Sequence, residues 1–278
     1  MDSPTPSIDE RRRSFRRLHE SGCFVIPNPW DVGSARALQS VGFPALATTS
    51  SGLAWSRGRV DGDVPREQVL RHLEDMVAAT RVPINADFES GYATSAAGAA
   101  ESVRLAIDCG IAGLSIEDAS GRSDEPLYPL VEAVERLRAV RRAIDRARAN
   151  VLLVGRSEGF IRGRPHLDET IARLRAYSDA GADCLYAPGI RTSEQIAAVV
   201  EAVAPKPVNV LIGGASAFSV SEVAALGVRR ISLGGALARA AWTGFLVAAR
   251  EIADHGRFDG LGSTISHDAL EAMLRDSS

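Results

Sequence analysis

Short apolar runs with β-strand character alternate with longer stretches of helical periodicity along the chain. Eight such runs occur, at residues 23–27, 45–49, 82–87, 113–117, 151–156, 184–187, 208–212 and 230–233. Between them, an apolar period of about 3.6 residues predicts helices, for example at 66–79, 96–108, 131–149, 167–180, 193–204 and 219–226. Strands that alternate with helices in this way form parallel sheets.

Eight strand–helix units in one chain of 278 residues predict a (β/α)₈ barrel of the TIM type. Glycines at positions 42, 110, 181 and 227 follow predicted helices, where a left-handed residue ends a helix before the next strand. The alternative is a doubly wound open sheet, which needs a glycine-rich phosphate turn after its first strand. Residues 27–33 lack that turn and therefore favour the barrel.

The C-terminal part of the chain continues beyond the eighth unit. Residues 236–253 predict a last barrel helix, residues 255–266 form a polar, glycine-rich stretch, and residues 267–274 predict a short amphipathic helix. We treat residues 1–278 as one barrel domain with a helical extension from about residue 240 to 278. An appendage of this kind often packs on a neighbouring subunit.

Composition and charge exclude several classes of protein. Hydrophobic residues make up 45% and charged residues 24% of the chain, which suits a globular core, and a net charge of −3 gives no general attraction for nucleic acid. The basic run at residues 11–17 is predicted to be the solvated face of a first helix, with Phe15 and Leu18 pointing inward. Three irregularly spaced cysteines, no apolar N-terminal signal and no membrane-spanning run predict a cytoplasmic protein without a membrane partner.

Three acidic residues stand where two of the apolar runs end. Asp87 and Glu89 end and follow the third run, and Glu117 ends the fourth. Carboxylates at the ends of buried strands are costly unless something pairs with them, either a neighbouring arginine or a cation. Hard oxygen ligands favour Mg²⁺, with Mn²⁺ as the alternative ion, and the sequence therefore predicts a metal-assisted enzyme site.

A barrel gathers further polar residues at the same mouth, because the C-terminal ends of its strands face one shared site. Arg156 can grip carboxylate or phosphate oxygens, and the hydroxyls and backbone N–H groups of residues 50–53 can face an oxyanion. No histidine stands at a strand end, so none is assigned as an acid or base. The predicted catalytic residues are Arg156, Asp61 and Ser51; the predicted substrate-binding residues are Ser50, Ser51, Gly52, Leu53, Arg156 and Asn209.

The order and spacing of these segments resemble the isocitrate lyase/phosphoenolpyruvate mutase superfamily over about residues 22–239. The matching segments are 27–36, 50–52, 61–62, 86–92, 115–118, 155–158 and 180–183. The resemblance implies a barrel whose terminal helix is exchanged between subunits, giving homodimers or homotetramers. It also implies Mg²⁺ near Asp87, Glu89 and Glu117, held mostly through water, with Asp61 nearby, and a substrate anion between Arg156 and residues 51–53.

The loop after the fourth strand departs from the better-known relatives. Residues 119–128 contain none of the Lys-Lys-Cys-Gly-His motif of the lyase branch and lack the Lys- and Asn-bearing gating loop of the mutase branch. Arg122, Ser123 or Tyr128 are candidates to close over the substrate, and Tyr128 or a water to supply the proton. The metal motif reads Asp-x-Glu-x-Gly, where better-known members have Asp-x-Asp-x-Gly.

The leading hypothesis is a Mg²⁺-dependent lyase that cleaves a carbon–carbon bond of a small 2-oxo or 2-hydroxy acid through an enolpyruvate-like intermediate. A phosphonate mutase or hydrolase that acts on a P–C bond is the second hypothesis. The third is a barrel that has lost catalysis and only binds a small anionic carboxylate.

Overall fold

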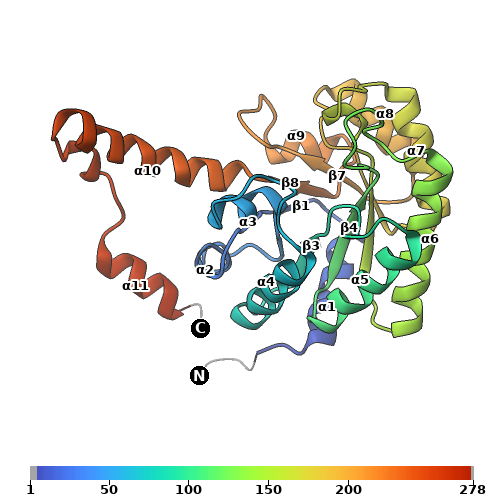
Figure 1. The fold of residues 1–278 in the computed structure, drawn as a ribbon, viewed down its shortest axis with the longest axis horizontal. Coiled ribbons are helices and arrows are strands. Elements are labelled where there is room, and N and C mark those ends of the chain that lie inside the picture. Colours follow the sequence, from blue (N-terminus) through green and yellow to red (C-terminus); the bar gives the residue numbers. More distant parts are fainter. Residues whose placement is uncertain (1–4, 277–278) are drawn as a thin grey trace.

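Eight parallel strands form a nearly closed barrel in the computed structural model, which describes residues 5–276 (Figure 1). The strands follow one another as neighbours, except that β1 pairs with β8, and the Ala47 N–H donates to the Pro27 carbonyl at 3.0 Å across the remaining gap. They are β1 (Phe24–Ile26), β2 (Leu46–Ala47), β3 (Ile84–Asp87), β4 (Gly113–Glu117), β5 (Leu152–Arg156), β6 (Cys184–Tyr186), β7 (Val208–Leu211) and β8 (Arg230–Ser232). The predicted barrel is confirmed. Residues 1–4, which belong to the N-terminal stretch predicted to lack an apolar signal, lie outside the described range.

The helices that precede the C-terminal arm agree closely with the apolar periodicity, and most of them cover the outside of the barrel. They are α1 (Ile8–Leu18), α2 (Val32–Ser40), α3 (Ser50–Ser56), α4 (Arg66–Ala79), α5 (Ala96–Asp108), α6 (Leu130–Ala147), α7 (Leu167–Asp179), α8 (Ser193–Val203) and α9 (Val220–Ala225). Side chains of Asp31, Thr49, Ser95, Thr192 and Ser219 cap helix N-termini. The predicted strands are mostly longer than the observed ones, because apolar residues flank each short ladder.

The lower end of the barrel is closed by α1. Phe15 is fully buried there and packs with Ile26, Leu152 and Val154 inside the barrel. The prediction that residues 11–17 form a solvated face is wrong at Arg12, which is buried and donates to the carbonyls of Ile107 and Ile111. The carbonyl groups at the end of α5 attract this guanidinium, because the last helical carbonyls have no partner in their own helix. Because α1 closes this end, the open mouth of the barrel lies at the opposite end, where the C-terminal ends of the strands are.

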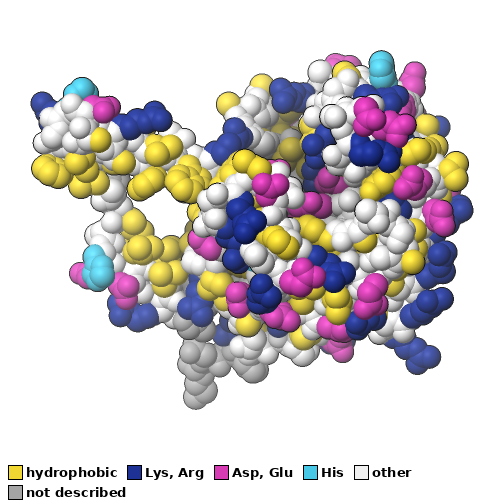
Figure 2. Space-filling model, viewed as in Figure 1, with side chains coloured by type: hydrophobic (Ala, Val, Ile, Leu, Met, Phe, Trp, Pro, Cys, Tyr) yellow, Lys and Arg dark blue, Asp and Glu magenta, His cyan; other side chains and the backbone are white. Residues whose placement is uncertain are grey.

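The C-terminal extension leaves the barrel as an arm (Figure 1). Helix α10 (Ala236–His255) carries exposed apolar side chains, including Trp242, Phe245 and Val247. Figure 2 shows hydrophobic side chains along the underside of this arm. After the 3₁₀ turn η2 (Asp259–Leu261), helix α11 (His267–Asp276) returns to pack on α2 of the same chain. Exchange of this helix between subunits stays a prediction. No helix within residues 5–276 is long and apolar enough to cross a membrane.

Candidate active site

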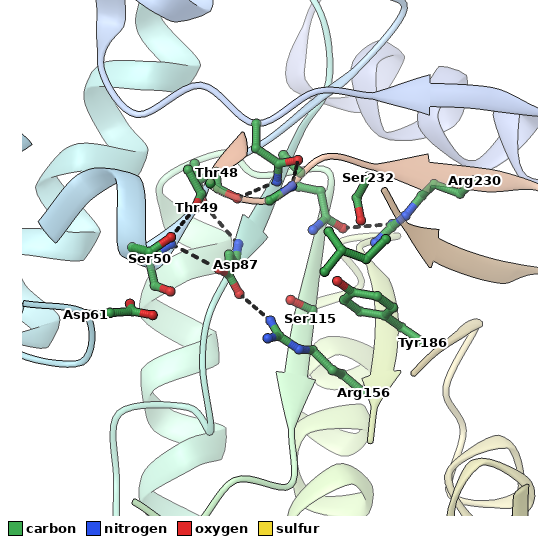
Figure 3. A pocket seen from close by; sticks show the side chains of 17 residues that line it. Thr48, Thr49, Ser50, Asp61, Asp87, Ser115, Arg156, Tyr186, Arg230 and Ser232 are labelled. Atoms are coloured by element: carbon green, nitrogen blue, oxygen red, sulfur yellow. Dashed lines mark hydrogen bonds and ion pairs between the residues drawn. The ribbon is translucent and has the colours of Figure 1, made fainter. Parts of the chain in front are cut away.

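A cavity of about 180 Å³ opens at the C-terminal ends of the strands (Figure 3). This volume is smaller than the roughly 300–1,000 Å³ of pockets for drug-sized ligands and suits a small acid. The walls come from almost every strand or the loop that follows it, and most of the lining residues have polar or charged side chains. The lining residues are Asn28, Ala47, Thr48, Thr49, Ser50, Ser51, Asp61, Asn85, Asp87, Ser115, Arg156, Tyr186, Leu211, Arg230, Ser232, Gly234 and Gly235.

Arg156, the last residue of β5, is the centre of the charged cluster at the mouth. Its Nη1 lies 3.1 Å from Asp87 Oδ1 and 3.2 Å from Glu117 Oε2, and its Nε donates to Glu158. The β4–β5 register pairs Glu117 directly with Arg156, which explains why these charges meet. Burial alone would lower the pKa of Arg156, but the three carboxylates together raise it well above its ordinary value.

Negative charge exceeds positive charge in this cluster. Arg162, which is 48% exposed, is the second guanidinium, 3.7 Å from Glu117 Oε1 and 3.5 Å from Glu158 Oε2. The two guanidiniums face five carboxylates that interact electrostatically with one another or with Arg156. If all are ionised, three negative charges remain unmatched on Asp61, Asp87, Glu89, Glu117 and Glu158.

The pKa values of the acids reflect this excess. Burial raises the pKa of Glu117 well above its ordinary value, although Arg156 acts in the opposite direction. Burial, with help from the Asp87 charge, raises the pKa of Glu89 to about 7. The pKa of Asp61 at the rim is raised by the same two causes, while Ser50 counteracts the shift. A cation bound among these groups would relieve that cost.

Two of the three predicted metal ligands lie beside the cavity rather than on its wall. Glu89 accepts a hydrogen bond from the Tyr92 hydroxyl at 3.0 Å and has a left-handed backbone, with φ of 45°. Its carbonyl accepts the Glu117 N–H at 3.0 Å, so the ends of β3 and β4 are locked together. Among residues 5–276, no group of three or more acidic, His or Cys side chains is arranged as a direct ligand set. Binding mostly through water stays a prediction.

Asp87 is the predicted metal ligand that lines the cavity. Its Oδ2 accepts the Ser50 N–H at 3.0 Å, and its own N–H donates to Thr48 Oγ1 at 2.9 Å. Figure 3 shows this carboxylate between the start of α3 and Arg156. One carboxylate oxygen of Asp87 thus contacts the Ser50 N–H and the other contacts Arg156. Asp87 lies on the cavity wall, where a substrate or a cation can contact it.

Residues 50–53 divide into two pairs. Ser50 and Ser51 line the cavity, whereas Gly52 and Leu53 are buried in α3 and do not. The Gly52 and Leu53 N–H groups donate to the side chain and carbonyl of Thr49, at 3.3 and 3.0 Å. A Cβ at position 52 would lie 2.8 Å from the Cβ of Trp30, so close packing accounts for this glycine. Serine hydroxyls, not these two amides, face the cavity.

The family model described as phosphoenolpyruvate phosphomutase matches residues 15–253. The chain belongs to this family. A solved structure from Burkholderia cenocepacia J2315, described as a candidate lyase/mutase, is 45% identical, with a TM-score of 0.94 over 97% of this chain and 98% of that one. The superfamily resemblance seen in the sequence is therefore confirmed.

Two further relatives are named for reactions that break a carbon–carbon bond. The oxaloacetate decarboxylase of Pseudomonas putida (strain GB-1) is 29% identical over 249 residues, which are 81% of this chain and 79% of the relative. A structure of oxaloacetate acetylhydrolase with its product oxalate is 27% identical, with a TM-score of 0.85 over 96% and 94% of the two chains. Lyases and mutases thus share this family's barrel, and an enzyme of that type is supported.

Three further residues named from the sequence do not line the cavity: the predicted substrate-binding residue Asn209 and the loop candidates Tyr128 and Arg122. Asn209 is fully buried and does not line the cavity; its amide donates to Ser232 and accepts from Arg230. Tyr128, a candidate proton donor, is buried with the Arg136 guanidinium 4.5 Å from its ring centre and lies away from the cavity. Arg122 pairs with Glu125 on an exposed loop.

Sequence reasoning missed the inward-facing side chains below the mouth: Asn85, Ser115, Tyr186, Arg230 and Ser232. The available signal was the period of two along each predicted strand, which puts alternate residues inside the barrel. In strands of three to five residues this signal is weak, and the register with the neighbouring strands decides which side chains face the barrel interior.

Proposed function

We propose that the protein is a Mg²⁺-dependent lyase that cleaves a carbon–carbon bond of a small 2-oxo or 2-hydroxy acid through an enolpyruvate-like intermediate. The observation that carries this proposal is the unmatched negative charge around a cavity that also contains hydroxyls and guanidiniums. An anionic substrate is repelled by such a mouth unless a cation joins it. The names of the two oxaloacetate enzymes among the relatives support the substrate class.

The residues present fit a divalent cation. Asp87 is the carboxylate that can reach it from the cavity wall, and Glu89 and Glu117 would hold it mainly through water, since Mg²⁺ keeps several of its waters. Burial raises the pKa of Glu89 and of Glu117, and a cation bound beside them would act in the opposite direction on both. When bound, Mg²⁺ supplies Lewis-acid polarisation of the substrate oxygens.

The chain's own groups then position the acid and move the proton. Ser50 and Ser51 offer hydroxyls to substrate oxygens, and Arg156 keeps Nη2 without a hydrogen bond to any residue in the described range. Breaking the carbon–carbon bond leaves its electron pair on the enolate, whose carbon must then accept a proton. Burial raises the pKa of the cavity phenol Tyr186 to about 12, so it stays protonated at neutral pH and is our candidate donor.

A substrate panel tests this proposal. The purified protein with MgCl₂ should cleave a carbon–carbon bond of at least one carboxylic acid among oxaloacetate, methylated malates and methylated citrates, with products identified by NMR. Turnover of phosphonopyruvate alone would instead establish the P–C reaction. Absence of turnover on every acid that calorimetry shows to bind would support the barrel that only binds.

Stability should depend on pH in a way that Mg²⁺ changes. Because the folded-state pKa of Glu89 is raised to about 7 from 4.5, the folded protein holds a proton that the unfolded chain has released, and stability falls as pH rises through this window. Urea titrations in EDTA should show a decline of at most about 3 kcal/mol between these values. Added MgCl₂ should remove the decline, since the cation favours the ionised form. An identical pH profile with and without Mg²⁺ would contradict a cation site at Glu89.

A further inference from the structure

Arg230 is a buried guanidinium at the floor of the cavity. It is the first residue of β8, two positions before Ser232, is 2% exposed and lines the cavity (Figure 3). Its Nε donates to Asn209 Oδ1 at 2.9 Å and its Nη1 to Asn85 Oδ1 at 3.3 Å. Within residues 5–276, no carboxylate forms an ion pair with Arg230, and its Nη2 makes no hydrogen bond.

Two other buried arginines of the barrel give a comparison: the first has carboxylate partners, and the second, like Arg230, donates only to neutral oxygens but does not line the cavity. Arg173 pairs with Asp118 and Glu169, and Arg136 donates to three backbone carbonyls. Arg230 has two neutral amide oxygens instead, which orient the guanidinium without neutralising its charge. A buried charge without a counter-charge is costly, and an arginine does not escape the cost by losing its proton.

The two ends of the cavity differ in free positive charge. At the mouth, the charge of Arg156 is already matched by Asp87, Glu117 and Glu158. At the floor, Arg230 remains unmatched, and the wall between the two ends carries the hydroxyl side chains of Ser115, Tyr186 and Ser232. The field inside the cavity therefore favours a negative group at its lower end.

We propose that Arg230 forms an anion subsite for a second carboxylate, so that the substrate is a small dicarboxylate whose far end reaches the barrel floor. The Nη2 group would donate to that carboxylate, and Asn85 and Asn209 hold the guanidinium in place for it. The choice of a dicarboxylate deepens the proposed function and rests on it, whereas the anion subsite itself can be tested by binding alone.

The test is calorimetric binding, in MgCl₂, of malate and 2-hydroxybutyrate, which have the same number of carbons and differ in a carboxylate versus a methyl group. The native protein should bind malate about 10–100-fold more tightly, the range expected for a hydrogen bond between charged groups. Arg230→Met should bind malate no more tightly than 2-hydroxybutyrate and leave the affinity for 2-hydroxybutyrate unchanged. Arg191→Met removes an exposed charge outside this cavity and should keep the preference.

Two further variants separate binding from folding. Arg230→Gln is neutral but can still bond the two amides, and should also lose the preference, whereas Arg230→Lys should retain part of it. Equal affinity of the native protein for the two acids would overturn the subsite, as would a preference that survives in both Arg230→Met and Arg230→Gln. A malate preference without turnover of any acid would leave the subsite standing and refute the lyase, so the two failures are distinguishable.

Discussion

Replacing Arg156 by methionine is expected to lower the free energy of unfolding by about 3–5 kcal/mol, the cost of removing one partner from a buried ion pair. Asp87, Glu117 and Glu158 share this guanidinium, and Glu158 is fully buried. Arg162 is too exposed, and too far from the carboxylates, to replace it. Urea unfolding at about pH 8, followed by circular dichroism, gives the measurement.

The penalty in this variant should shrink as the pH falls. Without Arg156, the folded-state pKa of Glu117, already raised by burial, rises further, so its protonated form avoids the cost at acidic pH. The double variant Arg156→Met/Glu158→Gln should be less destabilised than Arg156→Met, because one unpaired charge is gone. Arg104→Met breaks only exposed pairs with Glu101 and Asp108 and should change stability by at most about 1 kcal/mol. A loss at Arg156 no larger than at Arg104 would contradict a central role for this guanidinium.

Asp87→Asn is expected to lower kcat/KM for the best acid of the panel by about 10²–10³-fold while the fold is kept. The amide has the size of the carboxylate and an oxygen that can still accept the Ser50 N–H, but it lacks the charge that attracts a cation. Steady-state kinetics with and without excess MgCl₂ would measure the effect, and part of it should be recovered at high Mg²⁺.

Asp63→Asn provides the matched control. Asp63 is exposed in the same loop as Asp61 and does not line the cavity, so its neutralisation should leave turnover unchanged. If Asp87→Asn turned over substrate as fast as Asp63→Asn, the carboxylate at the end of β3 would have no part in the reaction.

The strand ends were the most predictable part of the site. Alternating strands and helices dictate a barrel, and a barrel brings Asp87, Glu117 and Arg156 to one mouth whatever their separation in sequence. Their pairing with one another follows from the β4–β5 register, which apolar periodicity does not specify. The strand-end positions therefore predicted either a cation or a neighbouring arginine as partner for the acids, and the register identifies the guanidinium of Arg156 as one such partner.

The floor of the cavity could not be predicted in the same way. Arg229 and Arg230 are adjacent and look alike in sequence, and only the pleat of the three-residue strand β8 turns Arg230 inward. Tyr186 was likewise an unremarked residue of an apolar run. At the other extreme, the amphipathic pattern of α11 predicted a helix correctly but carried no information on the surface that covers it.

The most direct test of the proposed function uses the carboxylic acid of the panel that is turned over fastest. Its turnover is measured with protein stripped by EDTA, as MgCl₂ is added back. The proposed lyase should lose at least about 10²-fold in rate without the cation and recover it in a saturable manner, because the carboxylates of the mouth repel the substrate when no cation is bound. Full turnover in EDTA, with no response to Mg²⁺, would contradict the proposed metal-dependent reaction.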